Sequence, residues 1–291
     1  MPLNAKEIRR RIKGVASTRQ ITKAMEMVAA AKVRRAQART TAARPYANGI
    51  QGMFASVTAH LPAGEVRSKL LARRDVKKVA IIVVTSDKGL AGAFNSNLLR
   101  AAVSRLREWR DKGAEPQLIV VGTKGVNFFR HSNFTIASRY TSLPALPTFT
   151  EATMISEEVI KLFNDEVVDK VELIYTKFHT MLRYTPEVVD LLPASLPEAT
   201  GAKQEADYLY EPSAEVMLEE LIPKYIEAVI FQGLLESTTS FFASQMAAMS
   251  AASKNAGEMI QHLTLVLNKA RQGAITQEIL EVVGGAEALK A

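Results

Sequence analysis

The chain has 291 residues, 47% of them hydrophobic, and a formal net charge of +7. It contains no cysteine, which excludes disulfide bonds, thiolate metal sites and thiol redox control. The N-terminus lacks the basic segment followed by an apolar run that is typical of a signal peptide, and no stretch of about 18 consecutive apolar residues is present to span a membrane. We therefore expect a chain that is soluble or at most peripheral to a membrane.

The positive charge is concentrated at the N-terminus. Residues 1–44 carry twelve Lys or Arg against Glu7 and Glu26, a net +10 that leaves −3 for the rest of the chain. A segment of this kind attracts nucleic acid, an anionic membrane surface or an acidic protein partner.

Residues 1–60 are predicted to form one long helix. Helix-favouring residues dominate from Leu3 to about Ala59, and an apolar stripe follows one face: Ile8, Ile12, Val15, Ile21, Met25 and Val28. Pro45 removes one backbone hydrogen bond and so either kinks or breaks this helix. No turn residue lies beside it, which favours the kink.

The hydrophobic period changes after this helix and predicts a separate domain over residues 75–195. Buried strands are expected at residues 79–85, 117–121, 170–180 and 184–192. Helices are expected at residues 98–110, capped by Asn95 or Asn97, then at 123–131, and at about 150–164, capped by Thr150. This alternation predicts a small, mainly parallel, Rossmann-like α/β domain.

Residues 208–291 are predicted to form a second long helix. From about Glu211 to Leu289, apolar and small residues recur at intervals of three, four and seven: Ile226, Ile230, Leu234, Phe241, Ala248, Ala252, Met259, Leu263, Val266 and Ala270. The alternative is a helix interrupted by turns, since each internal glycine costs about 1 kcal/mol relative to alanine.

The two long helices are expected to pair antiparallel, because neither is apolar enough all round to be buried in the central domain. Their lengths then leave about 20 residues, or ~30 Å, of the second helix projecting alone. This tip carries Ile275, Ile279, Leu280, Val282, Val283, Ala286 and Leu289. A lone apolar helix is unstable in water, so the tip needs a sleeve supplied by another protein.

No motif predicts catalysis, a cofactor or a metal. The Ser86–Asn95 segment follows a buried strand but lacks the glycine spacings that cradle phosphate, so a tight turn is expected, with Asp87 a turn or interface residue. The four histidines fall in separate predicted elements. Two alternatives stay open. They are nucleic-acid binding by the basic helix, whose first aromatic residue is only Tyr46, and a small-molecule enzyme on the α/β domain.

Four sequence blocks resemble the γ subunit, the central rotor shaft, of F-type ATP synthases. They are Ile8–Ile12 with Ile21–Val28, Ser86–Asn95, Asp207–Pro212, and Asn268–Gln272 continuing into Ile275–Glu281 and Gly285–Ala286. The resemblance implies a non-catalytic subunit whose two long helices form an antiparallel coiled coil inside a ring of three α and three β subunits. Ion-driven rotation of the c-ring would then change the nucleotide affinity of each β subunit in turn.

The resemblance also implies contact residues. Lys23 and Met25 match a coupling segment that faces a β-subunit loop, although Met25 has the alternative role of packing between the helices. The remaining matches are Arg271, Gln272 and Thr276 for the β catch loop, Val282, Val283, Ala286 and Leu289 for the apolar bearing, and Tyr208, Tyr210 and Glu211 for the foot that meets the ε subunit and the c-ring.

The implied location is peripheral, on the ATP-synthesising side of an energy-coupling membrane, which in bacteria is the cytoplasmic face of the inner membrane. Four positions depart from the family pattern, one of them Ala91, which stands where Cys is often found. Phe241 and Gln245 stand where Glu and Arg are usual, and Gly273 stands where Ala is usual.

Overall fold

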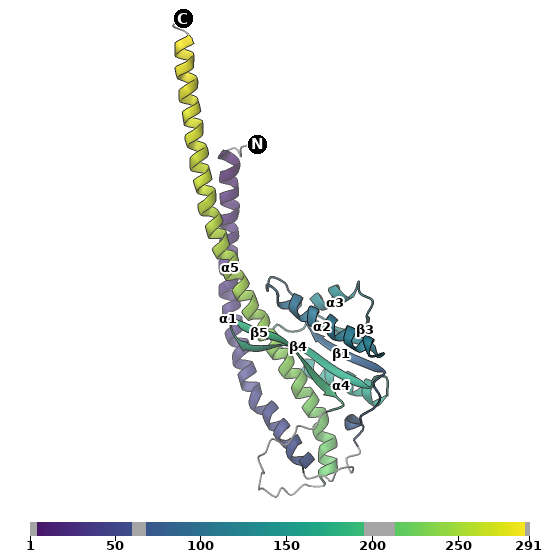
Figure 1. The fold of residues 1–291 in the computed structure, drawn as a ribbon. Coiled ribbons are helices and arrows are strands. Elements are labelled where there is room, and N and C mark those ends of the chain that lie inside the picture. The colour runs from purple at the N-terminus through teal and green to yellow at the C-terminus, as the bar shows by residue number, and fades with distance from the viewer. Residues whose placement is uncertain (1–4, 60–67, 195–212, 289–291) are drawn as a thin grey trace. The chain divides into compact units, whose positions relative to one another are not determined.

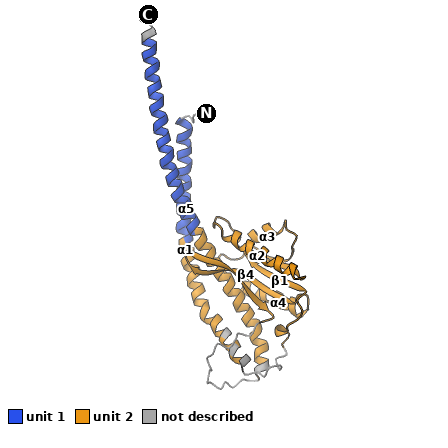
Figure 2. Ribbon diagram, in the orientation of Figure 1, with its two compact units in different colours: residues 1–29, 246–291 blue, residues 30–245 orange. Residues whose placement is uncertain are grey.

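The computed structural model describes residues 5–59, 68–194 and 213–288 (Figure 1). The chain divides into two units, one of residues 1–29 with 246–291 and the other of residues 30–245 (Figure 2). The two longest helices, α1 (Ala5–Ala59) and α5 (Ala214–Ala288), each contribute to both units. Both long helices predicted from the sequence are present over the described residues.

The larger unit is built on one five-stranded sheet with the order β3-β2-β1-β4-β5. All neighbouring strands run parallel except β5, which pairs antiparallel with β4. The strands are β1 (Lys78–Val84), β2 (Glu115–Val121), β3 (Thr135–Tyr140), β4 (Lys170–Thr180) and β5 (Arg183–Leu192). The mainly parallel α/β domain predicted from the sequence is confirmed.

Helices cover both faces of this sheet, which explains why β1 is apolar and buried from Val79 to Val84. Val79, Ile81 and Val83 pack with α2 (Phe94–Asp111) and α3 (Thr123–Phe129). The alternate residues Ala80 and Ile82 pack with α4 (Phe149–Asn164) and the first half of α5. A short 3₁₀ helix, η1 (Lys69–Leu71), adds Leu70 to the second core.

Within the larger unit α1 and α5 run antiparallel, as predicted. Three contacts show the direction, because the residue number falls along α1 as it rises along α5. The Phe54 and Tyr225 rings stack with their centroids 5.2 Å apart. The hydroxyls of Thr40 and Thr239 lie 3.0 Å apart, and the Lys32 Nζ lies 5.3 Å from the Phe242 ring centroid.

Buried hydroxyl groups attach α5 to the sheet where β4 extends past the end of β1. β1 pairs with β4 only as far as Ile174, so the next backbone groups of β4 have no strand partner on that side. The Thr176 backbone N–H donates to the Ser237 Oγ at 2.9 Å, and the Ser240 Oγ donates to the Thr176 carbonyl at 3.2 Å. Helix side chains thus complete the hydrogen bonding of this strand edge.

Several local predictions were wrong. β3 was not predicted, because its alternating exposure at the sheet edge is a weak strand signal. The Asn95 side chain does not cap α2 but bonds to Ser86, and α2 begins at Phe94. The α4 cap is Thr148, which forms a capping box with Glu151, and not Thr150. At Pro45 the helix is continuous, so the alternative of a break is excluded.

Candidate functional site

The smaller unit is a pair of helical segments, residues 5–29 of α1 and the part of α5 that begins at Met246. Small residues allow close approach, since a Cβ built on Gly257 would lie 3.6 Å from the Arg19 guanidinium. Thr22 and Ala29 are buried here, whereas the predicted stripe residues Ile21 and Val28 are 58% and 56% exposed. The predicted stripe was therefore wrong at these positions, and also at Met259, which is 53% exposed.

An open groove of about 630 Å³ lies along this helical pair. Its walls are formed by Ala16, Arg19, Gln20, Lys23, Ala24, Glu26 and Met27 of α1 and by Ser250, Ser253, Lys254 and Ile260 of α5. Large apolar side chains are exposed on the same two segments: Ile21, Met27, Val28, Met259 and Leu265. The unit thus presents both cationic and apolar groups to a partner.

Of the two predicted coupling residues on α1, only Lys23 faces the groove. Its Nζ pairs with the Glu26 carboxylate at 3.1 Å while most of the Lys23 side chain stays exposed. Met25 is half-buried and does not line the groove. Sequence reasoning missed Arg19 and Lys254, the two other cations of the groove, because only helix pairing brings them together.

The three predicted contact residues on α5 lie together, beyond the groove. Arg271, Gln272 and Thr276 are all exposed, and the Thr276 Oγ1 donates to the Gln272 carbonyl at 3.0 Å within the helix. This internal bond satisfies the Thr276 hydroxyl, and the Arg271 and Gln272 side chains are exposed to solvent. The structure does not bring these residues to Lys23.

The apolar tip of α5 is uncovered over its described length. Every residue from Arg271 to Ala286 is exposed, and Val282 and Val283 are 72% and 58% exposed. Ile275, Ile279 and Leu280 are also exposed, and so is Ala286. The predicted bearing residue Leu289 and the predicted foot residues Tyr208, Tyr210 and Glu211 lie outside the described residues.

The basic face of α1 is largely exposed to solvent. Its two described ion pairs in this unit are Arg11 with Glu7 at 3.3 Å and Lys23 with Glu26 at 3.1 Å, both between neighbouring turns. Arg9, Arg10 and Lys13 are also exposed. Surface pairs of this kind contribute little to stability, so the charge is available for a partner.

The loop after β1 is closed by hydrogen bonds and does not form a phosphate cradle. The Asp87 Oδ1 accepts from the Thr123 backbone N–H at 2.9 Å, from its hydroxyl at 2.5 Å and from the Ser142 N–H at 3.2 Å. Burial by itself would raise the pKa of Asp87, but these hydrogen bonds lower the pKa below its ordinary value. The expected turn role of Asp87 agrees with this geometry.

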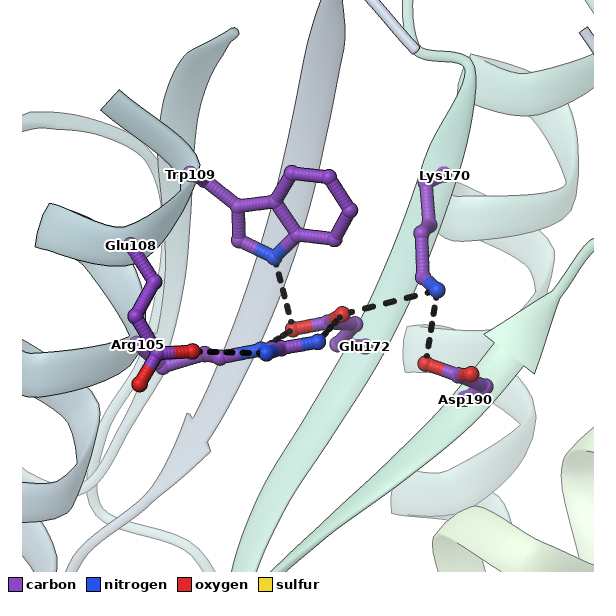
Figure 3. A network of polar contacts seen from close by, with 6 residues as sticks. All are labelled: Arg105, Glu108, Trp109, Lys170, Glu172 and Asp190. Carbon is purple, nitrogen blue, oxygen red and sulfur yellow. Dashed lines mark hydrogen bonds and ion pairs between the residues drawn. The ribbon is translucent and has the colours of Figure 1, made fainter. Parts of the chain in front are cut away.

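A buried polar network joins α2 to the sheet (Figure 3). The Glu172 carboxylate is fully buried and accepts from the Arg105 Nε at 2.8 Å and Nη2 at 2.6 Å. The Trp109 Nε1 donates to it at 3.1 Å, and the Lys170 Nζ lies 3.7 Å away. Hydrogen bonding to Glu172 raises the pKa of Arg105. A glutamate inside an apolar strand was the sequence signal for this network, and we overlooked it.

The described residues contain no group of three or more His, Cys, Asp or Glu side chains placed to hold a metal ion. Among the helices that the structure describes, none has the length and apolar character needed to cross a membrane.

Comparison with known proteins identifies relatives along the whole chain. A family model described as ATP synthase matches residues 4–289. The ATP synthase gamma chain of Pelotomaculum thermopropionicum is 46% identical and aligns with 98% of this chain and 99% of its own. The gamma chain of Brevibacillus brevis is 43% identical and aligns with 99% of each chain.

Two solved structures with a similar fold are chains of mitochondrial ATP synthases. A chain in the central stalk and c-ring of the Tetrahymena thermophila mitochondrial ATP synthase has a TM-score of 0.61 and 25% identity, and it aligns with 80% of this chain and 99% of its own. A chain of the Euglena gracilis enzyme has a TM-score of 0.65 at 19% identity, aligning with 98% of this chain and 94% of its own. The protein therefore belongs to the family of ATP synthase gamma chains, the non-catalytic central-stalk subunits of F-type ATP synthases.

Proposed function

We propose that the α5 tip turns inside a ring of alternating α and β subunits and couples rotation to nucleotide affinity at the β sites. The main support is the exposed apolar tip. Burying four of its side chains against partner subunits is worth roughly 6 to 12 kcal/mol gross, at ~1.5 to 3 kcal/mol each, relative to leaving them in water. A sleeve of apolar residues from several subunits is the partner that fits.

Coupling is proposed to pass through Lys23, Met25, Arg271, Gln272 and Thr276 as contacts of β-subunit loops. The exposed cations support this proposal, because they can reach carboxylates on a partner from different rotational positions. An asymmetric shaft presents a different face to each β subunit, so the three sites differ in nucleotide affinity at any moment. No catalytic group on the shaft is needed.

The opposite end of the rotor is proposed to meet the ε subunit and the c-ring through Tyr208, Tyr210 and Glu211. The matching sequence block supports this assignment. A gamma chain is part of a membrane-associated complex, and we place this one on the cytoplasmic face of a bacterial inner membrane. The relatives give no support to the nucleic-acid-binding alternative.

Assembly tests the proposal most directly. The full chain is co-expressed with α and β subunits from one of the bacterial relatives, and the native mass and ATPase activity of the purified complex are measured. We expect one copy of this chain per three αβ pairs, and lower ATPase activity when residues 275–291 are deleted. Val282→Asp with Val283→Asp should lower activity as well, whereas Glu258→Gln, an exposed change outside the tip, should not. Folded α and β subunits that never retain this chain would refute the proposal.

The coupling residues need a separate measurement, because a complex can hydrolyse ATP without pumping ions. In inverted membrane vesicles, Lys23→Ala and Arg271→Ala should reduce proton pumping more than ATP hydrolysis. Arg9→Ala, which removes an exposed α1 cation outside the proposed set, is the matched control. Equal losses of proton pumping in all three variants would show that coupling depends on the overall positive charge of the chain and not on Lys23 and Arg271.

A further inference from the structure

A cavity of about 270 Å³ lies within the larger unit, apart from the surfaces proposed for coupling. Its floor is formed by the ends of β1 and β2 at Val84, Thr85, Val121 and Gly122. Side chains of α5, the start of α2 and the loop of residues 143–147 close its sides: Phe94, Leu143, Pro147, Thr238, Phe241 and Phe242. The volume lies near the lower limit for small-molecule sites, which suits a ligand of one or two rings.

The cavity lies beside the position that an open α/β sheet favours for ligands. From β1 the chain passes to β2 and then β3 on one side, and afterwards returns to β4 on the other side of β1. The sheet therefore has its topological switch point between β1 and β4. Ligands of such sheets bind outside the carboxyl ends of the strands near this point. The cavity lies at the carboxyl ends of β1, one of the two strands at the switch point, and of its other neighbour β2.

The cavity walls are aromatic. The Phe94 and Phe241 rings meet edge to face with centroids 5.6 Å apart, and the Phe241 and Phe242 centroids lie 5.3 Å apart. These three side chains are at least nine-tenths buried and packed, so their positions are fixed before a ligand arrives. A planar ring is the group that such walls hold best, since further edge-to-face contacts become available to it.

The charge at the rim is positive. The Lys32 Nζ lies over the Phe242 ring, and no carboxylate of the described residues pairs with Lys32 or Lys88, which both line the cavity. The one lining carboxylate is Asp87, and its Oδ1 already accepts three hydrogen bonds from Thr123 and Ser142. A ligand therefore meets two lysines without a protein counter-ion and one carboxylate that is already engaged.

We propose that this cavity binds a small aromatic carboxylate, with its ring between the phenylalanines and its charge toward Lys32. Such a ligand would contact α1, α5 and the sheet domain at once, all within the larger unit. Its binding would stabilise the packing of both helices against that domain. No residue of the proposed coupling set takes part.

Calorimetry of the full chain with naphthalene-2-carboxylate tests this proposal, and naphthalene-2-carboxamide serves as the uncharged ligand of the same shape. We expect saturable binding of one equivalent of the carboxylate, with the carboxamide about tenfold weaker, as the loss of one charged contact predicts. Lys32→Gln should remove this difference between the two ligands. Thr238→Trp, which fills the cavity from a half-buried wall position, should abolish binding of both.

Lys13→Gln, an exposed change on the same helix but outside the cavity, is the matched control and should bind like the wild type. Circular dichroism of each variant shows whether it is folded. The proposal is overturned if the wild type binds neither compound. It is equally overturned if folded Lys32→Gln and Thr238→Trp chains bind both compounds as the wild type does, because the binding site then lies elsewhere.

Discussion

The hydroxyl oxygens of Thr40 on α1 and Thr239 on α5 lie 3.0 Å apart in a part of the helix interface where both residues are buried. Each hydroxyl also lies within hydrogen-bond distance of a carbonyl one turn earlier in its own helix, at Ala36 and at Leu235. Two hydrogens serve three contacts, so only two of the three hydrogen bonds can form at once, and a hydroxyl that donates across the interface gives up the bond to its own helix. The pair therefore links the two helices.

We expect Thr40→Val and Thr239→Val to be coupled by about 1 kcal/mol in a double-mutant cycle, the usual net value of one buried hydrogen bond. Urea unfolding followed by Trp109 fluorescence measures this coupling. Thr264→Val removes an exposed hydroxyl bonded only to its own helix, at Ile260, and should be nearly neutral. Additive effects of the two buried substitutions would show that the contact contributes no stability.

Glu172 provides a sharper stability test. Glu172→Gln keeps the shape of the side chain but leaves the Arg105 guanidinium without its buried counter-charge, and we expect a loss of about 3 kcal/mol in unfolding free energy. Glu108→Gln removes the other carboxylate that Arg105 contacts, at 2.7 Å, but Glu108 is half-exposed. That control should cost at most about 1 kcal/mol. Similar losses in the two variants would contradict the assignment of Glu172 as the principal partner.

Alanine substitutions at two glycines with positive φ distinguish the cost of backbone strain from the cost of steric overlap. Gly113 has φ +82° with nothing within 4 Å of an added Cβ, so Gly113→Ala should cost only about 1 kcal/mol. Gly122 has φ +93°, and its added Cβ would lie 2.4 Å from the Thr85 carbonyl oxygen. Gly122→Ala should therefore cost about 2 to 4 kcal/mol in thermal unfolding. Equal melting temperatures for the two variants would rule out the overlap.

The hydrogen bonds to Asp87 predict a pH dependence of stability. Because the pKa of Asp87 is lower in the folded chain than its ordinary 3.8, the stabilisation is complete above that ordinary value and is lost as pH falls toward the folded pKa. The difference in unfolding free energy between wild type and Asp87→Asn should thus be larger at pH 6 than at about pH 3. A difference that stays constant with pH would mean that the carboxylate charge is unimportant.

The exposed part of α5 offers a way to stiffen the shaft. A Cβ added at Gly273 meets nothing within 4 Å, so Gly273→Ala should gain helix stability of about 1 kcal/mol without a steric penalty. Amide hydrogen exchange over residues 269–288 should slow in this variant, while exchange in the β-sheet should not change. Unchanged exchange near position 273 would show that the glycine does not limit helix stability there.

The sequence predicts best what depends on long, regular patterns. Both long helices and the two central strands are recognisable because each repeats one period over many residues. β3 escaped prediction because it lies at a sheet edge, where Thr135, Ala137 and Arg139 are exposed and the alternate residues are only half-buried, so no buried apolar run marks the strand. The helix interface was misassigned at Ile21 because size, and not hydrophobicity, selects Thr22 and Ala29 where helices approach closely.

The candidate site likewise has one part that the sequence predicts and one part that it does not. Exposure of the tip could be inferred from helix lengths alone, and the described residues Val282 and Val283 are indeed exposed. The groove could not be inferred, because Arg19 and Lys254 belong to different helices and only their register makes them neighbours. The roles of Lys23 and Arg271 as partner contacts stay predictions until the assembled complex is tested.

The two hydrogen bonds between α5 and Thr176 have a mechanical consequence. Successive residues of a helix point about 100° apart, so turning α5 on its own axis by even one residue position would separate both Ser237 and Ser240 from β4. These bonds to the sheet thus fix the rotation of α5 about its own axis at Ser237 and Ser240. Torque applied to α5 at this level therefore turns the sheet domain with it, because the helix cannot rotate about its own axis without breaking these two hydrogen bonds.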